Sequence, residues 1–286
     1  MREIPAEKHT ILVAGAELSY WVAGEGPDLL LCNGLLASEV AFRPLLGHFV
    51  DRYRLVWWRY RGLGGVAGGE PAAPERHALD ALAILDELRI QRVALVGWSM
   101  GVQVALECYR AASERVAALV LVGGGARLPF GPRPEATFPG TRMPALMRGL
   151  SRLPGMVQRH GNGLLGFPEA LAWVRRLSLV GANSDPELVA TLLRDVSRMP
   201  AEAWLETAQL LLAHDATDIL PSVHVPTLAV AAGRDPFTSR AAVERLVTAP
   251  NAEYLVLPAA THFVLLDHAD HLHLRMDKFF SEHGYV

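Results

Sequence analysis

The feature that most constrains the fold of this chain is a series of short, continuously apolar runs that alternate with helical patterns. Continuous apolar character is typical of strands buried on both faces, and their alternation with helices favours a largely parallel sheet covered by helices. These runs occur at 28–32, 53–58, 92–97, 116–122, 227–232 and 253–257. The sequence therefore predicts an α/β fold.

Helical patterns are expected between most of these runs, and a hairpin is expected before them. The hairpin joins 10–14 to 17–23 around Gly15. In the pattern at 74–89, Leu recurs at near-helical spacing after Pro74, as in an amphipathic helix with Pro in its first turn. The other expected helices span 39–49, 100–112, 239–248 and 262–281.

The composition changes after residue 122. Residues 123–168 contain ten Gly and seven Pro, and apolar helical patterns follow before the strand–helix alternation resumes at 223. We therefore predict one α/β core made of residues 1–123 and 217–286, interrupted by a helical cap at 124–216. Two tandem domains are less favoured, because the last third of the chain has too few strands for its own sheet.

Charge and composition exclude several classes of function. The 286 residues carry 27 Lys and Arg against 30 Asp and Glu, so a net charge of -3 gives no argument for binding nucleic acid or an anionic membrane. Cys32 and Cys108 form no CxxC motif and are expected to pack in the core. The N-terminus lacks a signal-peptide pattern, and no apolar run approaches the ~18 residues of a membrane span. We expect a cytoplasmic protein that acts on a small molecule.

The segment VALVGWSMG at 93–101 combines a strand, the pattern G-x-S-x-G and the start of a helix. This combination is typical of a nucleophile elbow, which presents a serine at the carboxyl end of a sheet. The sharp turn requires strained backbone angles at Ser99, and Gly97 and Gly101 avoid the crowding that side chains would cause. The sequence therefore predicts Ser99 as a nucleophile.

A nucleophilic serine needs a base to accept its proton and a carboxylate to orient that base. With the serine first in the chain, the acid is expected after a late strand and the histidine last. Asp235 follows the strand at 227–232, and His262 follows the strand at 253–257. Because the carboxyl ends of parallel strands meet at one edge of a sheet, we expect Ser99, Asp235 and His262 to form a catalytic triad.

Other titratable residues fit these roles less well. An alternative place for the acid is the loop after 116–122, but its first carboxylate is Glu135. No further ligands accompany His268 and His271, so no metal site is expected. The remaining candidate histidines are expected on helix faces or in loops: His214, His224 and His273.

An oxyanion formed during acyl transfer needs two hydrogen-bond donors. The first expected donor is the backbone N–H of Met100, directly after the nucleophile. The second is the N–H of Leu35 in the loop after the strand at 28–32, where Gly34 permits close approach of the backbone. The alternative for Asn33-Gly34 is an ordinary turn.

These motifs resemble those of the α/β-hydrolase family, in its cofactor-free branch of serine esterases and lipases. The similar segments lie on both sides of the expected cap: LCNGLLAS, RYRGLGG, VGWSMG, PTLAVAAGRDPF and THFVLLD. The resemblance implies a mostly parallel eight-stranded sheet with helices on both faces, and an inserted cap that covers the site. Two departures are Asn33 where the family has His, and Arg59 where the motif D-x-R-G-x-G begins with Asp.

The residues and the resemblance together predict hydrolysis of carboxylic esters through an acyl-enzyme, without a metal or an organic cofactor. Carbon–carbon bond hydrolysis, amide cleavage, perhydrolysis and acyl transfer would use the same triad. Epoxide and haloalkane hydrolysis are disfavoured, because they need a carboxylate where Ser99 stands. The non-enzymatic alternative is a ligand receptor that retains the triad.

The sequence is less informative about the substrate. Asn33 and Gly34 are expected beside it, and Trp98 either lines the pocket or packs beneath the elbow. Aromatic residues of the expected cap suggest an apolar acyl or alcohol part, although helix packing would also explain them. They are Phe130, Phe138, Phe167, Trp173 and Trp204.

Overall fold

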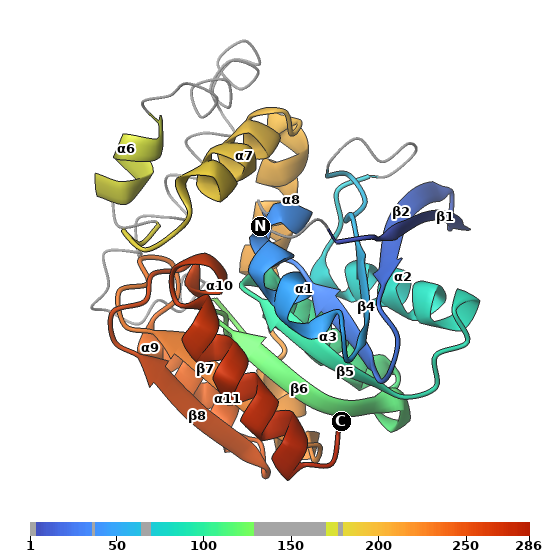
Figure 1. Ribbon diagram of the computed structural model, residues 1–286. Helices are drawn as coiled ribbons and strands as arrows, with labels where there is room; N and C mark the ends of the chain where they lie inside the picture. Colours follow the sequence, from blue (N-terminus) through green and yellow to red (C-terminus); the bar gives the residue numbers. More distant parts are fainter. Residues whose placement is uncertain (1–3, 36–37, 64–69, 129–169, 177–179) are drawn as a thin grey trace.

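The computed structural model describes residues 4–35, 38–63, 70–128, 170–176 and 180–286. These residues form an eight-stranded sheet with the order β1-β2-β4-β3-β5-β6-β7-β8 (Figure 1). Its strands are β1 (Glu7–Val13), β2 (Ala16–Ala23), β3 (Asp28–Cys32), β4 (Arg54–Trp58), β5 (Val93–Trp98), β6 (Val116–Val122), β7 (Thr227–Ala232) and β8 (Ala252–Leu257).

Most of the sheet is parallel, as the sequence predicts. β1 and β2 form an antiparallel hairpin, and β2 also pairs antiparallel with β4. Every other pair of neighbours, from β4–β3 to β7–β8, is parallel. The carboxyl ends of β3, β5, β6, β7 and β8 therefore lie along one edge of the sheet.

Helices cover both faces of the sheet, which explains the continuous apolar character of its central strands. In β5, Val93 and Leu95 pack in one hydrophobic cluster, with α2 (Pro74–Glu87) and α3 (Met100–Ala111). Ala94 and Val96 point to the opposite face and pack in a second cluster, with α1 (Arg43–Phe49) and α11 (Ala269–Glu282).

The expectation of one helix over 262–281 is wrong. Two helices are present, α10 (Val264–Asp267) and α11, and the break is at His268, whose φ of -134° and ψ of 35° are not helical. The break coincides with an inward turn of Asp267, which accepts hydrogen bonds from Thr261. No Gly or Pro marks this position, so the local sequence gives no sign of it.

The segment between β6 and β7 contains α6 (Ala170–Arg176), α7 (Pro186–Ser197) and α8 (Ala201–Ala213). A small hydrophobic cluster joins α6 and α7 to Val40 in η1 (Glu39–Phe42) and Leu266 in α10. Where this segment leaves and rejoins the sheet, its two end stretches of backbone pair with each other. Ala216 N–H donates to Ala126 O at 2.9 Å, and Arg127 forms a β-bridge with Asp215. The division into core and cap stays a prediction.

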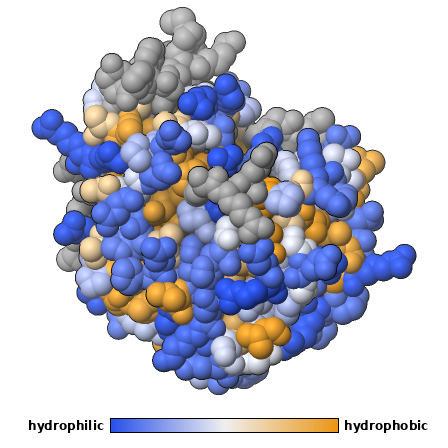
Figure 2. All heavy atoms as spheres, in the orientation of Figure 1, coloured by the Kyte–Doolittle hydropathy of each residue, from blue (hydrophilic) through white to orange (hydrophobic). Residues whose placement is uncertain are grey.

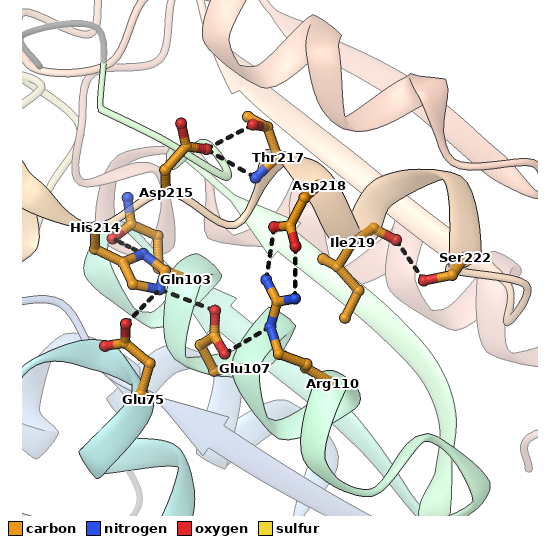
Figure 3. Close-up of polar contacts among 10 residues, drawn as sticks. All are labelled: Glu75, Gln103, Glu107, Arg110, His214, Asp215, Thr217, Asp218, Ile219 and Ser222. Atoms are coloured by element: carbon orange, nitrogen blue, oxygen red, sulfur yellow. Dashed lines mark hydrogen bonds and ion pairs between the residues drawn. The ribbon is translucent and has the colours of Figure 1, made fainter.

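A buried polar network ties the end of α8 to α3 (Figure 3). His214 Nε2 donates to Glu107 Oε1 at 2.9 Å, and its Nδ1 lies 3.0 Å from Gln103 Oε1. Burial acts to raise the pKa of Glu107, but hydrogen bonds from His214 and Arg110 outweigh it and hold that pKa below its usual range. His214 follows α8 in a loop, as the sequence predicts, but its side chain is buried and anchors that loop to α3.

The face of the molecule drawn in Figure 2 is largely hydrophilic, with hydrophobic residues gathered beneath α7. Within the described residues, no helix combines the length and apolar character that crossing a membrane requires.

In the RYRGLGG segment, Arg61 pairs with a carboxylate of α2. Arg61 Nε donates to Asp80 Oδ2 at 2.7 Å, and the Arg61 guanidinium also donates to Val13 O in β1. Both side chains of this ion pair are buried, with exposed fractions of 8% for Arg61 and 0% for Asp80. The pair thus joins α2, the loop after β4 and the end of β1.

Asp80→Asn should destabilise the protein by about 3–5 kcal/mol, because it leaves the buried Arg61 charge without its partner. The matched control is Asp86→Asn on the same helix. Asp86 pairs with Arg115 but is 68% exposed, and it should contribute less than about 1 kcal/mol. Urea denaturation of both variants measures the difference, and equal losses would contradict a special role for the buried pair.

Candidate active site

Ser99 lies in a strained turn between β5 and α3. Its φ of 57° and ψ of -118° are rare for a residue with a side chain. The turn is fixed by a hydrogen bond of 2.9 Å from Ser99 N–H to Val122 O, at the end of the neighbouring strand β6. This conformation places the hydroxyl at the carboxyl edge of the sheet.

The two glycines of the turn are required by close packing, as the sequence predicts. A Cβ on Gly101 would overlap the carbonyl oxygen of Cys32, at the end of β3. A Cβ on Gly97 would overlap the carbonyl oxygen of Gly101 itself. The backbone of α3 therefore lies directly against the end of β3, and the turn at Ser99 lies beside the loop that follows β3.

The structure brings Ser99, His262 and Asp235 into one hydrogen-bonded chain. His262 Nε2 lies 3.0 Å from Ser99 Oγ, and its Nδ1 lies 2.8 Å from Asp235 Oδ2. The three residues follow β5, β8 and β7, respectively, at the shared carboxyl edge. His262 and Asp235 are both buried, with exposed fractions of 7% and 8%. Geometry of this kind suits activation of a serine by a general base.

The loops that carry Asp235 and His262 are held by further hydrogen bonds. Asp235 Oδ1 accepts from the N–H groups of Phe237 and Thr238, at 2.8 and 2.9 Å, so its second oxygen remains for His262. Asp267 Oδ2 accepts from both N–H and Oγ1–H of Thr261, the residue before His262. Burial raises the pKa of Asp267, while the hydrogen bonds from Thr261 oppose that rise.

The expected oxyanion loop lies beside Ser99. A Cβ on Gly34 would be 3.3 Å from Ser99 Cβ, so only glycine fits here without displacement of neighbours. Asn33 Oδ1 accepts from Gly34 N–H at 2.9 Å. Met100 is the first residue of α3, and its N–H therefore has no partner within the helix. The role of the Leu35 and Met100 N–H groups as oxyanion donors stays a prediction.

Tyr60 holds the loop of Asn33 and Gly34 by a hydrogen bond to its backbone. Its hydroxyl donates to Asn33 O at 2.9 Å, and its ring stacks on His77. Burial raises the pKa of Tyr60 well above its usual range, so the phenol keeps its proton and remains a donor. Tyr60 and Asp267 lie in the similar segments but are not predicted from the sequence. The partner of Tyr60 is 27 residues away, and the partner of Asp267, six residues away, is brought near only by the turn before α10.

A cavity of about 320 Å³ opens at the expected oxyanion loop. Two of the predicted substrate-binding residues, Asn33 and Gly34, form part of its wall, together with Leu35. Ser99 and Trp98 do not, and Trp98 is only 2% exposed. The rest of the wall is formed by Ser38, Glu39, Trp58, Arg59, Tyr60, Leu63, Asp195, Arg198 and Met199.

The aromatic residues of the expected cap differ in exposure, and several of them are not described by the structure. Trp173 is 54% exposed, and Trp204 is partly buried against the core. Phe130, Phe138, Phe167 and Glu135 lie outside the described residues. Among the described residues, no group of three or more His, Cys, Asp or Glu side chains is arranged to hold a metal ion.

Comparisons with known proteins agree on one family. A family model for the alpha/beta hydrolase fold matches residues 27–269. The crystal structure of the enol-lactonase from Burkholderia xenovorans LB400 is similar with a TM-score of 0.77 and 22% identity, covering 96% of this chain and 100% of that one.

Two curated relatives are also similar over most of the chain. The pimeloyl-(acyl-carrier protein) methyl ester esterase of Stenotrophomonas maltophilia is 29% identical over 263 residues, which are 90% of this chain and 94% of that protein. The polyketide synthase ThaQ of Burkholderia thailandensis is 30% identical over 265 residues, or 91% of this chain. This chain spans only 12% of the length of that synthase.

Gly101→Ala should prevent correct folding or strongly destabilise the protein, because the new methyl group would overlap backbone atoms that cannot move independently. The matched control is Gly47→Ala in α1, where a Cβ would meet no atom within 4 Å. That change should stabilise the helix by about 0.5–1 kcal/mol. Soluble yield and thermal unfolding of both variants test the expectation, which fails if Gly101→Ala unfolds at the wild-type temperature.

Proposed function

Because this chain belongs to the α/β-hydrolase family, we propose that it is a serine hydrolase that cleaves carboxylic esters through an acyl-enzyme intermediate. The observation that carries the proposal is the chain of hydrogen bonds from Ser99 Oγ through His262 to Asp235. Carboxyl edges of parallel sheets are where α/β proteins bind their ligands, and the three residues meet there.

In the proposed acylation step, Ser99 Oγ attacks the carbonyl carbon of the ester while His262 Nε2 accepts the hydroxyl proton. Asp235 accepts a hydrogen bond from Nδ1–H, which leaves Nε2 free as the acceptor and stabilises the imidazolium that forms. The N–H groups of Leu35 and Met100 hold the oxyanion. His262 then gives its proton to the leaving alcohol.

Deacylation repeats these steps with water. His262 Nε2 accepts a proton from the water, whose oxygen attacks the acyl carbon, and the proton then returns to Ser99 Oγ as the acid leaves. Every proton transfer passes through His262, so the proposed reaction needs no metal and no organic cofactor.

For the substrate, we propose a small ester with an apolar acyl or alcohol part that occupies the cavity at the oxyanion loop. The apolar part of the cavity wall is formed by Leu35, Leu63 and Met199, and Trp58 adds an aromatic surface. The Stenotrophomonas relative is named for a methyl ester, which supports an ester as the class of substrate. Transfer of the acyl group to an alcohol or a peroxide would retain the acyl-enzyme and change only the acceptor.

Ser99→Ala should abolish hydrolysis of p-nitrophenyl esters and labelling by a fluorophosphonate, because no other group replaces the attacking oxygen. Its thermal unfolding should resemble that of the wild type. Ser197→Ala, at a partly exposed serine of α7, serves as the control and should retain both properties. Ester turnover by Ser99→Ala would overturn the assignment. Ligand-induced stabilisation without ester turnover by the wild type would favour a receptor.

Met199→Trp tests whether the cavity holds the substrate. The larger side chain should lower kcat/KM for p-nitrophenyl octanoate by about tenfold or more and change that for the acetate by about twofold at most. Arg194→Trp, on the exposed part of α7 and outside the cavity wall, is the control. Equal effects of Met199→Trp on both esters would place the substrate elsewhere.

A further inference from the structure

Three buried tryptophans lie at the carboxyl ends of β4 and β5, but only one has a hydrogen bond from its indole N–H within the described residues. Trp98 Nε1–H donates to the backbone carbonyl oxygen of His262 at 2.9 Å. The Nε1 atoms of Trp57 and Trp58 are also buried, yet no acceptor lies near them in the described structure. Of the three, Trp98 is the one whose indole N–H is bound to the loop of His262.

The hydrogen bond completes the support of the loop that carries His262. On one side, Asp267 holds the N–H and the hydroxyl of Thr261. On the other side, the Trp98 indole holds the carbonyl of His262, and its ring packs against Phe263 with the centroids 5.0 Å apart. The backbone is thus held at the peptide group before Thr261 and at the peptide group after His262.

The same indole contacts the oxyanion loop. A Cβ on Gly34 would lie 3.1 Å from Cε3 and Cζ3 of Trp98, so the loop backbone rests on the benzene part of the ring. Trp98 is also joined to Ser99 by a peptide bond. One side chain therefore contacts the base and the oxyanion loop, and its backbone carries the nucleophile.

We propose that Trp98 is a positioning residue, whose indole N–H fixes His262 at the distance from Ser99 Oγ that proton transfer requires. This inference rests on the proposed triad but assigns a new role to Trp98. Proton transfer and attack are sensitive to displacements of about 0.5 Å, so a loosened His262 loop lowers kcat. Trp98 does not line the cavity, and KM should therefore change little.

Two substitutions separate the hydrogen bond from packing. In Trp98→His, the imidazole Nε2 occupies the ring position of the indole Nε1 and retains a donor, but the benzene part is lost. Trp98→Phe retains more apolar volume and has no donor. If the N–H positions His262, kcat for p-nitrophenyl acetate at about pH 8 should fall about tenfold in Trp98→Phe and about threefold or less in Trp98→His.

Packing alone predicts the opposite order, because phenylalanine fills a buried apolar site better than histidine does. Trp98→His should accordingly have the lower midpoint of urea unfolding, although it has the higher kcat. The burst of p-nitrophenol released in the first turnover counts the active molecules, so partial misfolding does not lower the measured kcat. A kcat of Trp98→Phe equal to or above that of Trp98→His overturns the proposal.

Trp57→Phe is the matched control. Trp57 is buried in β4, and its indole N–H has no acceptor in the described structure, so kcat should stay within about twofold of the wild type. Ser99→Ala measured in parallel keeps the two proposals apart. Residual turnover in Ser99→Ala contradicts the proposed function, whereas an inactive Ser99→Ala with a fully active Trp98→Phe contradicts only the role of Trp98.

Discussion

The positive φ of Ser99 is maintained by the packing of neighbouring strands, and the geometry of the site depends on it. Below the turn, the glycine at 101 lets α3 contact the carbonyl of Cys32 in β3. Beside it, Val122 O in β6 accepts the Ser99 N–H. A relaxed φ would move the start of α3, and the Met100 N–H with it, away from β3 and the loop that follows β3. The strain at one residue is therefore offset by contacts of the strands around it.

The proposed acid and base are positioned by the sheet, not by local sequence. Asp235 and His262 come from the loops after β7 and β8, and both are more than 130 residues from Ser99 along the chain. Parallel pairing of β5 with β6, β6 with β7 and β7 with β8 aligns the three loop positions at one edge. Further contacts hold the two loops: Asp267 and Trp98 hold the loop of His262, and the N–H groups of Phe237 and Thr238 hold Asp235.

The sequence predicts the features that local patterns encode. Apolar runs locate the strands within one or two residues, and the glycine pattern at Ser99 identifies the turn and its close packing. Features that depend on distant partners were missed. Arg61 finds its carboxylate 19 residues away in Asp80, and His214 is buried against Glu107, 107 residues earlier in the chain. No local pattern encodes such pairs, because each half alone resembles an ordinary surface charge.

In the proposed function, chemistry and substrate selection depend on different parts of the chain. All proposed catalytic groups follow strands of the sheet or begin α3. The cavity wall, in contrast, includes Asp195, Arg198 and Met199, from the end of α7 and the residues that follow it. The pairing of Ala126 with Ala216 brings both ends of this segment together, so its sequence can vary while the strands keep their register. We infer that substitutions around α7 alter which ester binds, whereas the geometry at Ser99 sets how fast its carbonyl is attacked.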